Sequence, residues 1–255
     1  MGFFSKLNKL RKGLFSSIYI NEKSNISDEQ YKKIAIGALY SEQQTAYINS
    51  LTTGLNKSEL INGLAEWWGI SNSDEANETL QYLVDKGFRY YFDIVMKAYK
   101  NPDYDQHKNI IIKEFESIKD NYESYGDWEE DVIKAYDQLT NLQDTWDSLE
   151  KNKIISNVYE LEKYKNIGWD CGRLVYLSRM CFDTGYITEN ETWNYIDKAY
   201  KLATDNFNTW EEFSKSYIIG RGMWGGLNSA NEGMMIIAQE LLTKENSPWV
   251  KLKFK

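Results

Sequence analysis

The chain has 255 residues, of which 42% are hydrophobic, 27% are charged and only two are proline. This composition excludes collagen-like and disordered proteins and leaves a chain long enough to bury its own core. The net charge of -8 excludes a nucleic-acid-binding protein with a generally basic surface. Because the sequence has no apolar run of about 18 residues, we expect no membrane-spanning helix.

The first 21 residues differ in charge from the rest of the chain. They include four basic residues and no acidic residue, and their apolar residues recur at helical spacing. This pattern predicts a basic amphipathic helix. Two interpretations remain open, because such a helix either packs on the protein's own core or contacts an acidic partner or the anionic inner face of a membrane.

Helix start and stop signals divide the following residues into a series of predicted helices. Ser27 and Gln30 have the spacing of a capping box, and Gly69 ends the next helix, because glycine favours the left-handed conformation of a C-terminal cap. A third helix ends at Gly87. Further predicted helices cover residues 89–100, 107–122 and 128–151, and a turn at 124–127 is the best internal boundary.

The last third of the chain has the clearest helix boundaries. A helix over residues 169–183 ends at Gly185, and Thr188 with Glu191 forms a capping box for the next helix. Two more helices follow. No alternating pattern long enough for a sheet occurs, so the sequence predicts an all-α fold of about nine or ten helices, with residues 22–255 as a single helical domain.

Cysteine and histidine are too rare for several kinds of site. Cys171 and Cys181 lie ten residues apart in one predicted helix, which separates them by about 15 Å. A disulfide requires Cα atoms roughly 4.4–6.8 Å apart, so we expect free thiols and a cytoplasmic protein. His107 is the only histidine, which excludes a Cys/His zinc site, and we expect neither a metal nor a cofactor.

Arginine is rare in this chain and therefore informative. Only five of the thirty basic residues are arginine, and arginine is favoured over lysine where a planar group with five donors is needed. Asp170 and Arg173 share one apolar helix face, and Arg221 shares another with Tyr217, beside Gly220.

These two helix faces allow two interpretations. If they meet, Arg173, Arg221 and Tyr217 form a site for a phosphate or carboxylate, and Asp170 orients an arginine or acts as a base. The alternative is structural, with Asp170 and Arg173 as a buried ion pair that fixes the register of the helices.

Two blocks of the sequence resemble a known family. The residues that carry the resemblance are, in chain order, Trp68-Gly69-Ile70, Gly87, Arg89, Trp169-Asp170, Arg173, Arg179, Gly185-Tyr186-Ile187, Trp193, Trp210, Phe213, Ser216-Tyr217 and Gly220-Arg221. They are similar to the bacterial family catalogued as domain of unknown function 1266, which includes YbeU-like proteins. Members often have histidine after the glycine equivalent to Gly87, where this chain has Phe88. The resemblance implies a compact helical domain and no established activity, substrate or cofactor.

Two functions from different classes fit these observations. The first is a non-enzymatic cytoplasmic module that binds another protein, because nineteen tyrosines and nine tryptophans supply the contact area that interfaces favour. Analogy with other uncharacterised bacterial families links such a module to interbacterial toxin or defence systems. An exposed patch would favour this function if it contained several of Trp67, Tyr90, Tyr91, Trp128 and Trp146.

The second function is an enzyme or sensor that binds a small anionic ligand through Arg173 and Arg221. A solvent-reachable pocket on which both guanidinium groups converge would favour this alternative. Saturation of both arginines by carboxylates or carbonyls of the protein would exclude it.

Overall fold

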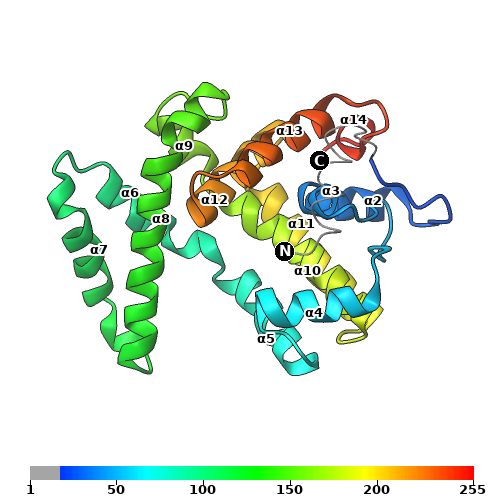
Figure 1. Ribbon diagram of the computed structural model, residues 1–255, viewed down its shortest axis with the longest axis horizontal. Coiled ribbons are helices and arrows are strands. Elements are labelled where there is room, and N and C mark those ends of the chain that lie inside the picture. Colours follow the sequence, from blue (N-terminus) through cyan, green and yellow to red (C-terminus); the bar gives the residue numbers. More distant parts are fainter. Residues whose placement is uncertain (1–17) are drawn as a thin grey trace. The chain divides into compact units, whose positions relative to one another are not determined.

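The structure is a computed structural model that describes residues 18–255 (Figure 1). Across this range the chain forms helices, short 3-10 turns and loops, with no β-strand. Nine of the α-helices in the described range have eight residues or more. The predicted all-α fold is therefore confirmed. The basic segment predicted over residues 1–21 lies outside the described residues, apart from its last four.

The helices follow one another with short connections. The α-helices are α2 (Asp28–Ile34), α3 (Ala38–Gln44), α4 (Lys57–Trp68), α5 (Ser73–Asp85), α6 (Phe92–Tyr99), α7 (His107–Glu116), α8 (Tyr125–Lys151), α9 (Val158–Tyr164), α10 (Ile167–Thr184), α11 (Glu189–Asn206), α12 (Trp210–Gly225), α13 (Ser229–Thr243) and α14 (Pro248–Lys251). Four 3-10 turns cover Ala35–Gly37, Phe88–Tyr91, Tyr104–Gln106 and Lys119–Asn121.

Side-chain caps explain why several helices begin and end where the sequence predicts. The Ser27 hydroxyl accepts from the Gln30 N–H at 3.2 Å, and the Gln30 side chain accepts from the Ser27 N–H at 3.0 Å. Thr188 and Glu191 form the same capping box before α11. Gly69 ends α4 with φ of 66°, a conformation that favours glycine. These predicted boundaries are confirmed.

Three predicted boundaries differ from the structure. The helix predicted over 89–100 begins as a 3-10 turn, because the Asp170 carboxylate accepts from two N–H groups of that turn, and α6 starts only at Phe92. The helix predicted over 107–122 ends at Glu116, and a 3-10 turn follows. The predicted turn at 124–127 is the first turn of α8, since the Ser124 hydroxyl caps it.

Contacts group the described residues into two compact units. The first unit comprises residues 18–84, Cys171–Trp210 and Ile236–Lys255, and the second comprises Asp85–Asp170 and Glu211–Met235. Within the second unit, α6, α7 and α8 pack against one another (Figure 1). The segment 124–127 lies inside the second unit, and the single-domain organisation stays a prediction.

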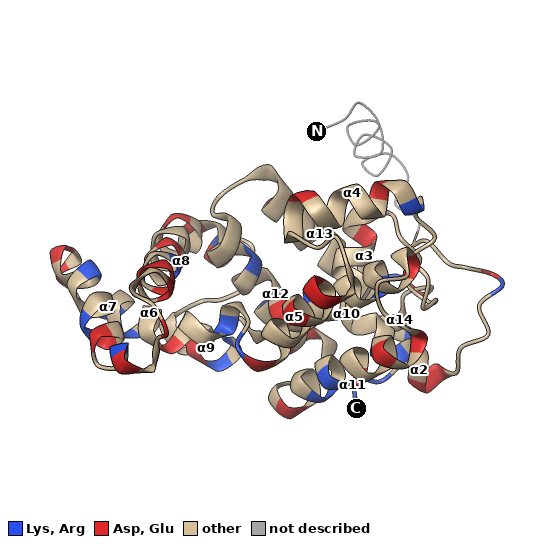
Figure 2. Cartoon of the chain, turned by 90° about the horizontal axis from the view of Figure 1, so that it is seen from below, with Lys and Arg blue, Asp and Glu red and all other residues tan. Residues whose placement is uncertain are grey.

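Helix α8 carries much of the negative charge of the chain. It contains eight aspartates and glutamates but only two lysines, and Figure 2 shows acidic residues recurring along it. Seven of these carboxylates are exposed, and Asp131 is the buried exception. The exposed face of α8 therefore repels an anionic ligand.

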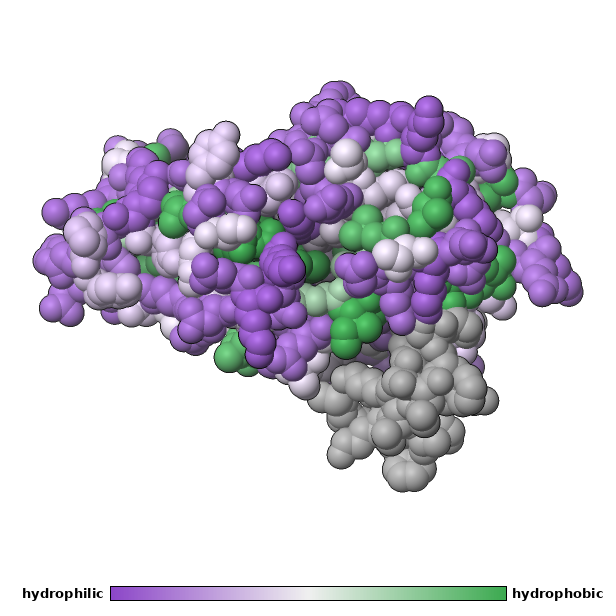
Figure 3. All heavy atoms as spheres, turned by 90° about the horizontal axis from the view of Figure 1, so that it is seen from above, coloured by the Kyte–Doolittle hydropathy of each residue, from purple (hydrophilic) through white to green (hydrophobic). Residues whose placement is uncertain are grey.

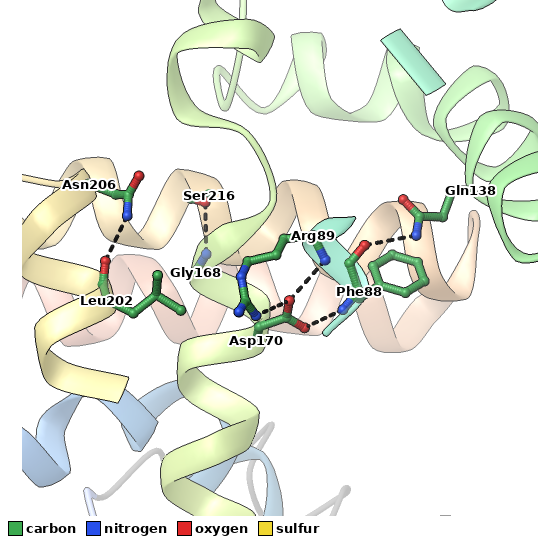
Figure 4. A network of polar contacts seen from close by, with 8 residues as sticks. All are labelled: Phe88, Arg89, Gln138, Gly168, Asp170, Leu202, Asn206 and Ser216. Atoms are coloured by element: carbon green, nitrogen blue, oxygen red, sulfur yellow. Dashed lines mark hydrogen bonds and ion pairs between the residues drawn. The ribbon is translucent and has the colours of Figure 1, made fainter. Parts of the chain in front are cut away.

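Two glycines allow α10 and α12 to approach closely within the second unit. A Cβ atom on Gly168 would lie 2.7 Å from the Tyr217 backbone nitrogen, and one on Gly220 would lie 2.4 Å from the Trp169 Cβ. The Gly168 N–H also donates to the Ser216 hydroxyl at 2.9 Å (Figure 4). No other residue type fits at Gly168 or Gly220 without moving one helix.

Substitution of these glycines should therefore destabilise the protein. We expect Gly220→Ala and Gly168→Ala each to lower the free energy of unfolding by about 1–3 kcal/mol, because the added methyl group overpacks the crossing. Gly233→Ala is the matched control, since a Cβ there meets nothing within 4 Å and should stabilise α13 by up to about 1 kcal/mol. Urea denaturation measures all three. Equal stability of Gly220→Ala and Gly233→Ala would contradict the close crossing.

Candidate functional site

Arg179 is a structural arginine of the first unit. Its side chain is fully buried on α10. Its Nε donates to the Leu51 carbonyl at 3.1 Å, Nη1 to the Ser41 hydroxyl at 2.9 Å, and Nη2 to the carbonyls of Tyr47 and Thr52 at 2.6 and 3.0 Å. Burial lowers the pKa of Arg179 to about 10. Four acceptors engage four of the five N–H groups of this guanidinium, so Arg179 fixes the loop after α3.

Asp170 anchors the turn before α6. Its carboxylate is 1% exposed and accepts from the N–H groups of Phe88 and Arg89 at 3.0 and 2.9 Å. The Arg89 Nη1 also donates to it at 3.1 Å (Figure 4). Gly87 is required beside this carboxylate, because it has φ of 58° and a Cβ there would lie 2.4 Å from Asp170 Oδ2. The pairing of Asp170 with Arg89 spans 81 residues and was not predicted from helix periodicity.

Arg173 and Trp68 form a cation–π contact in the first unit. The guanidinium carbon lies 5.7 Å from the centre of the Trp68 ring, and the Arg173 side chain is nine-tenths buried. Arg173 belongs to the first unit and Arg221 to the second. Their convergence on one ligand therefore stays a prediction.

Arg221 lies on α12 in an environment quite different from that of Arg179. Its guanidinium carbon is 5.1 Å from the centre of the Trp169 ring and 5.2 Å from that of Trp224. The residue is nine-tenths buried, and its Nε has no hydrogen-bond acceptor. Within residues 18–255 no hydrogen bond or ion pair reaches the Arg221 side chain. A buried donor without an acceptor costs free energy, so this guanidinium is the strongest candidate to bind an anion.

Tyr217 packs beneath this arginine through Trp169. The Tyr217 side chain is fully buried, and its ring meets the Trp169 ring edge-on at 5.1 Å. Three of the four predicted site residues, Asp170, Tyr217 and Arg221, thus belong to the second unit. Tyr217 supports the indole on which Arg221 lies.

Asn166 is a polar residue of this region that sequence analysis missed. It immediately precedes α10, is completely buried, and neither atom of its side-chain amide has a hydrogen-bond partner among the described residues. A Cβ on Gly220 would lie 3.2 Å from the Asn166 Cβ. An asparagine just before a helix usually caps that helix, so its position in the sequence does not single it out as a site residue.

The other residues of the family pattern have structural roles. Gly185 ends α10 with φ of 85°, and the half-buried Tyr186 follows it. The Trp210 ring stacks on Trp249 at 5.1 Å, and its Nε1 donates to the Leu252 carbonyl at 2.8 Å. These contacts join α12, α14 and the C-terminal residues.

The five aromatic residues expected in an exposed patch have mixed environments. Trp67 is 72% exposed and Tyr90 is 38% exposed, whereas Tyr91 and Trp128 are buried and Trp146 is half-buried. On the face shown in Figure 3, apolar side chains lie in separate spots among hydrophilic ones. The protein-binding function stays a prediction.

The cysteines and the histidine are buried, and the histidine is hydrogen-bonded within the fold. Between residues 18 and 255, no three His, Cys, Asp or Glu side chains are grouped to hold a metal ion. Both cysteines are buried and free, and burial raises the pKa of Cys181 to about 12. The His107 Nε2 lies 2.8 Å from the Asn101 carbonyl, and its Nδ1 lies 3.1 Å from the Gln143 amide nitrogen. No helix in the described range is long and apolar enough to cross a membrane.

Residues 18–255 define an all-α protein whose motif residues are mostly buried, and in that range the Arg221 Nε lacks an acceptor. The chain matches the family described as "Protein of unknown function (DUF1266)" over residues 63–254 and belongs to that family. The matched range contains all of the residues that carry the resemblance, from Trp68 to Arg221. Neither the search of curated proteins nor the search of solved structures found a match.

A second polar cluster lies around Asp131 in the second unit. The carboxylate accepts from the Tyr91 and Tyr122 hydroxyl groups at 2.6 and 2.7 Å and from the Lys86 ammonium at 2.5 Å. Burial alone raises the carboxyl pKa, but these hydrogen bonds outweigh burial and hold the pKa of Asp131 below its ordinary value. Three donors satisfy this carboxylate, so the cluster stabilises the fold.

Asp131→Asn should destabilise the protein more at pH 7 than at pH 3. The pKa of Asp131 is lower in the folded state than in the unfolded state, where it is about 3.9. The carboxylate therefore contributes stability above the unfolded value, and this contribution is lost as pH falls through the folded value. Thermal unfolding at both pH values measures the difference, with the exposed Asp137→Asn as control. An equal loss at both pH values would overturn this interpretation.

Proposed function

We propose that this protein is a binding protein, or sensor, for an anionic group that Arg221 holds. The observation that carries this proposal is the nine-tenths buried Arg221. Its Nε has no acceptor in the part of the chain that the structure describes, and two indole rings lie against its guanidinium. The ligand is a carboxylate or a phosphate, because these oxyanions accept paired hydrogen bonds from guanidinium groups.

The two tryptophans contact the Arg221 guanidinium without accepting hydrogen bonds from its N–H groups. Trp169 and Trp224 contact the guanidinium through their π systems, and such contacts do not satisfy N–H donors. An oxyanion in the plane of the guanidinium would accept from the Nε and an Nη together. The low dielectric of this buried site strengthens that charged hydrogen bond.

Three asparagines fix the end of α12 that carries Trp224. Asn141 donates to the carbonyls of Met223 and Trp224 at 3.0 and 3.2 Å, Asn228 donates to the Gly225 carbonyl at 2.8 Å, and Asn231 donates to the Gly226 carbonyl. These bonds satisfy carbonyl groups that a helix end leaves unpaired. The indole is thereby held in place before a ligand arrives, which favours binding.

The state of Asp170 supports a binding role over a catalytic one. This carboxylate was the candidate base, and it already accepts three hydrogen bonds from Phe88 and Arg89. Its lone pairs are engaged in holding the turn before α6. The two free, buried cysteines support the proposal that the protein acts in the reducing cytoplasm.

Replacement of Arg221 should abolish anion binding. We expect acetate and inorganic phosphate to raise the melting temperature of the wild-type protein at constant ionic strength, and the affinity of Arg221→Gln to fall by about tenfold or more, since one charged hydrogen bond contributes about 1.5–3 kcal/mol. Lys215→Gln is the matched control, because it removes one positive charge from the same helix. Isothermal titration calorimetry measures the affinities. Equal affinities of Arg221→Gln and wild type would refute the proposed function.

A further inference from the structure

Asn166 and Arg221 are two buried polar side chains that the protein leaves without partners beside one helix crossing. The Asn166 amide presents one donor group and one acceptor, and both atoms are shielded from solvent. Each buried polar atom left unpaired costs roughly 1–3 kcal/mol. An apolar residue at position 166 would avoid this cost, so the amide indicates a ligand that satisfies it.

The crossing of α10 and α12 sets the spacing between these two groups. Gly220 stands directly before Arg221, and a Cβ on Gly220 would lie 3.2 Å from the Asn166 Cβ and 2.4 Å from the Trp169 Cβ. Since neighbouring Cα atoms are about 3.8 Å apart, the Asn166 Cβ lies within roughly 9 Å of the Arg221 Cα. The two side chains therefore start from backbone positions that lie close together at one helix crossing.

The backbone beside Asn166 is held in a strained conformation. Lys165 has φ of 51° and ψ of -156°, a region that residues other than glycine rarely adopt. The Lys165 carbonyl accepts from the Ser216 hydroxyl at 3.3 Å, and its ammonium pairs with Asp93 at 2.9 Å. Strain of this kind concentrates at binding sites, and here it coincides with the unpaired amide.

The charge of these unpartnered groups favours a single negative charge on the ligand. Arg221 supplies one positive charge and Asn166 supplies none. A phosphate dianion would leave one buried negative charge without compensation, in a chain whose net charge is already -8. A carboxylate balances the guanidinium and matches its planar edge.

We propose that the ligand is a carboxylate preceded by an amide, as at the C-terminal residue of a peptide or in an N-acyl amino acid. The carboxylate accepts from Arg221, while the ligand's amide C=O accepts from Asn166 Nδ2. The C=O and N–H of a trans amide point in opposite directions, so one asparagine side chain makes a single hydrogen bond with that amide. Trp224 and Leu227, which are 48% and 59% exposed, offer an apolar rim for the rest of the ligand. This inference rests on the proposed anion site at Arg221.

The test compares N-acetylglycine, which has both groups, with acetate, N-acetylglycinamide and inorganic phosphate. We expect the wild-type protein to bind N-acetylglycine about fivefold more tightly than acetate or phosphate, because one hydrogen bond to Asn166 is added. N-acetylglycinamide, which lacks the carboxylate, should not bind. Asn166→Leu should retain the acetate affinity and lose the preference for N-acetylglycine.

Two variants of Asn166 distinguish loss of the ligand contact from loss of the fold. Asn166→Leu removes two unpaired polar atoms at similar volume and should fold at least as stably as wild type, which urea denaturation checks; Asn166→Ala should lose the same preference. Equal binding of acetate and N-acetylglycine, tighter binding of phosphate, or an unchanged preference in Asn166→Leu overturns the inference while leaving the anion site intact. Failure of all three anions to bind the wild type overturns the anion site as well.

Chain length distinguishes the two sources of this chemistry. An acetylated triglycine that binds more tightly than N-acetylglycine identifies a peptide C-terminus, because additional peptide units then contact the protein. Equal affinities identify a free N-acyl amino acid. Both results support the pairing of Arg221 with Asn166.

Discussion

The close approach of two helix backbones determines the chemistry of the second unit. Gly168 and Gly220 allow α10 and α12 to touch, and this contact places Trp169 directly below the helix that carries Arg221. A side chain at either glycine would separate the helices and withdraw the indole from the guanidinium. The buried cation, its aromatic support and the neighbouring Asn166 amide all depend on this crossing.

The two buried arginines with the best-defined surroundings show how one residue type serves stability and binding. Arg179 meets four protein acceptors, so its desolvation is repaid within the fold. Among residues 18–255 the Arg221 side chain meets aromatic rings and no acceptor, so under the proposed function an anion offsets its desolvation. Retaining such an arginine makes the free protein less stable than it could be, which is typical of binding sites. The difference between the two lies in their partners and not in their burial.

Sequence patterns within a few residues predicted many of the helix boundaries. They could not predict contacts between residues far apart in the sequence. Capping boxes at Ser27 and Thr188 and glycine caps depend on residues three or four apart, so the sequence alone locates them. The scarcity of arginine drew attention to Arg221 for a sound physical reason. Neither signal could show that Asp170 binds Arg89, because that contact joins residues 81 positions apart. Asn166 could not be predicted for another reason. It is a candidate because its buried amide has no hydrogen-bond partner among the described residues, and a sequence pattern does not show whether a side chain is paired.

The central claim is that Arg221 binds an anion. NMR of the arginine Nε–H groups tests it most directly. The chain has five arginines, so a proton–nitrogen NMR spectrum of the Nε–H groups contains five signals, and Arg221→Gln identifies one of them. We predict that acetate added at constant ionic strength moves the Arg221 signal downfield to saturation, while the Arg179 signal, already bonded to the Leu51 carbonyl, stays in place. An Arg221 signal that does not respond to acetate, N-acetylglycine or phosphate would contradict the account.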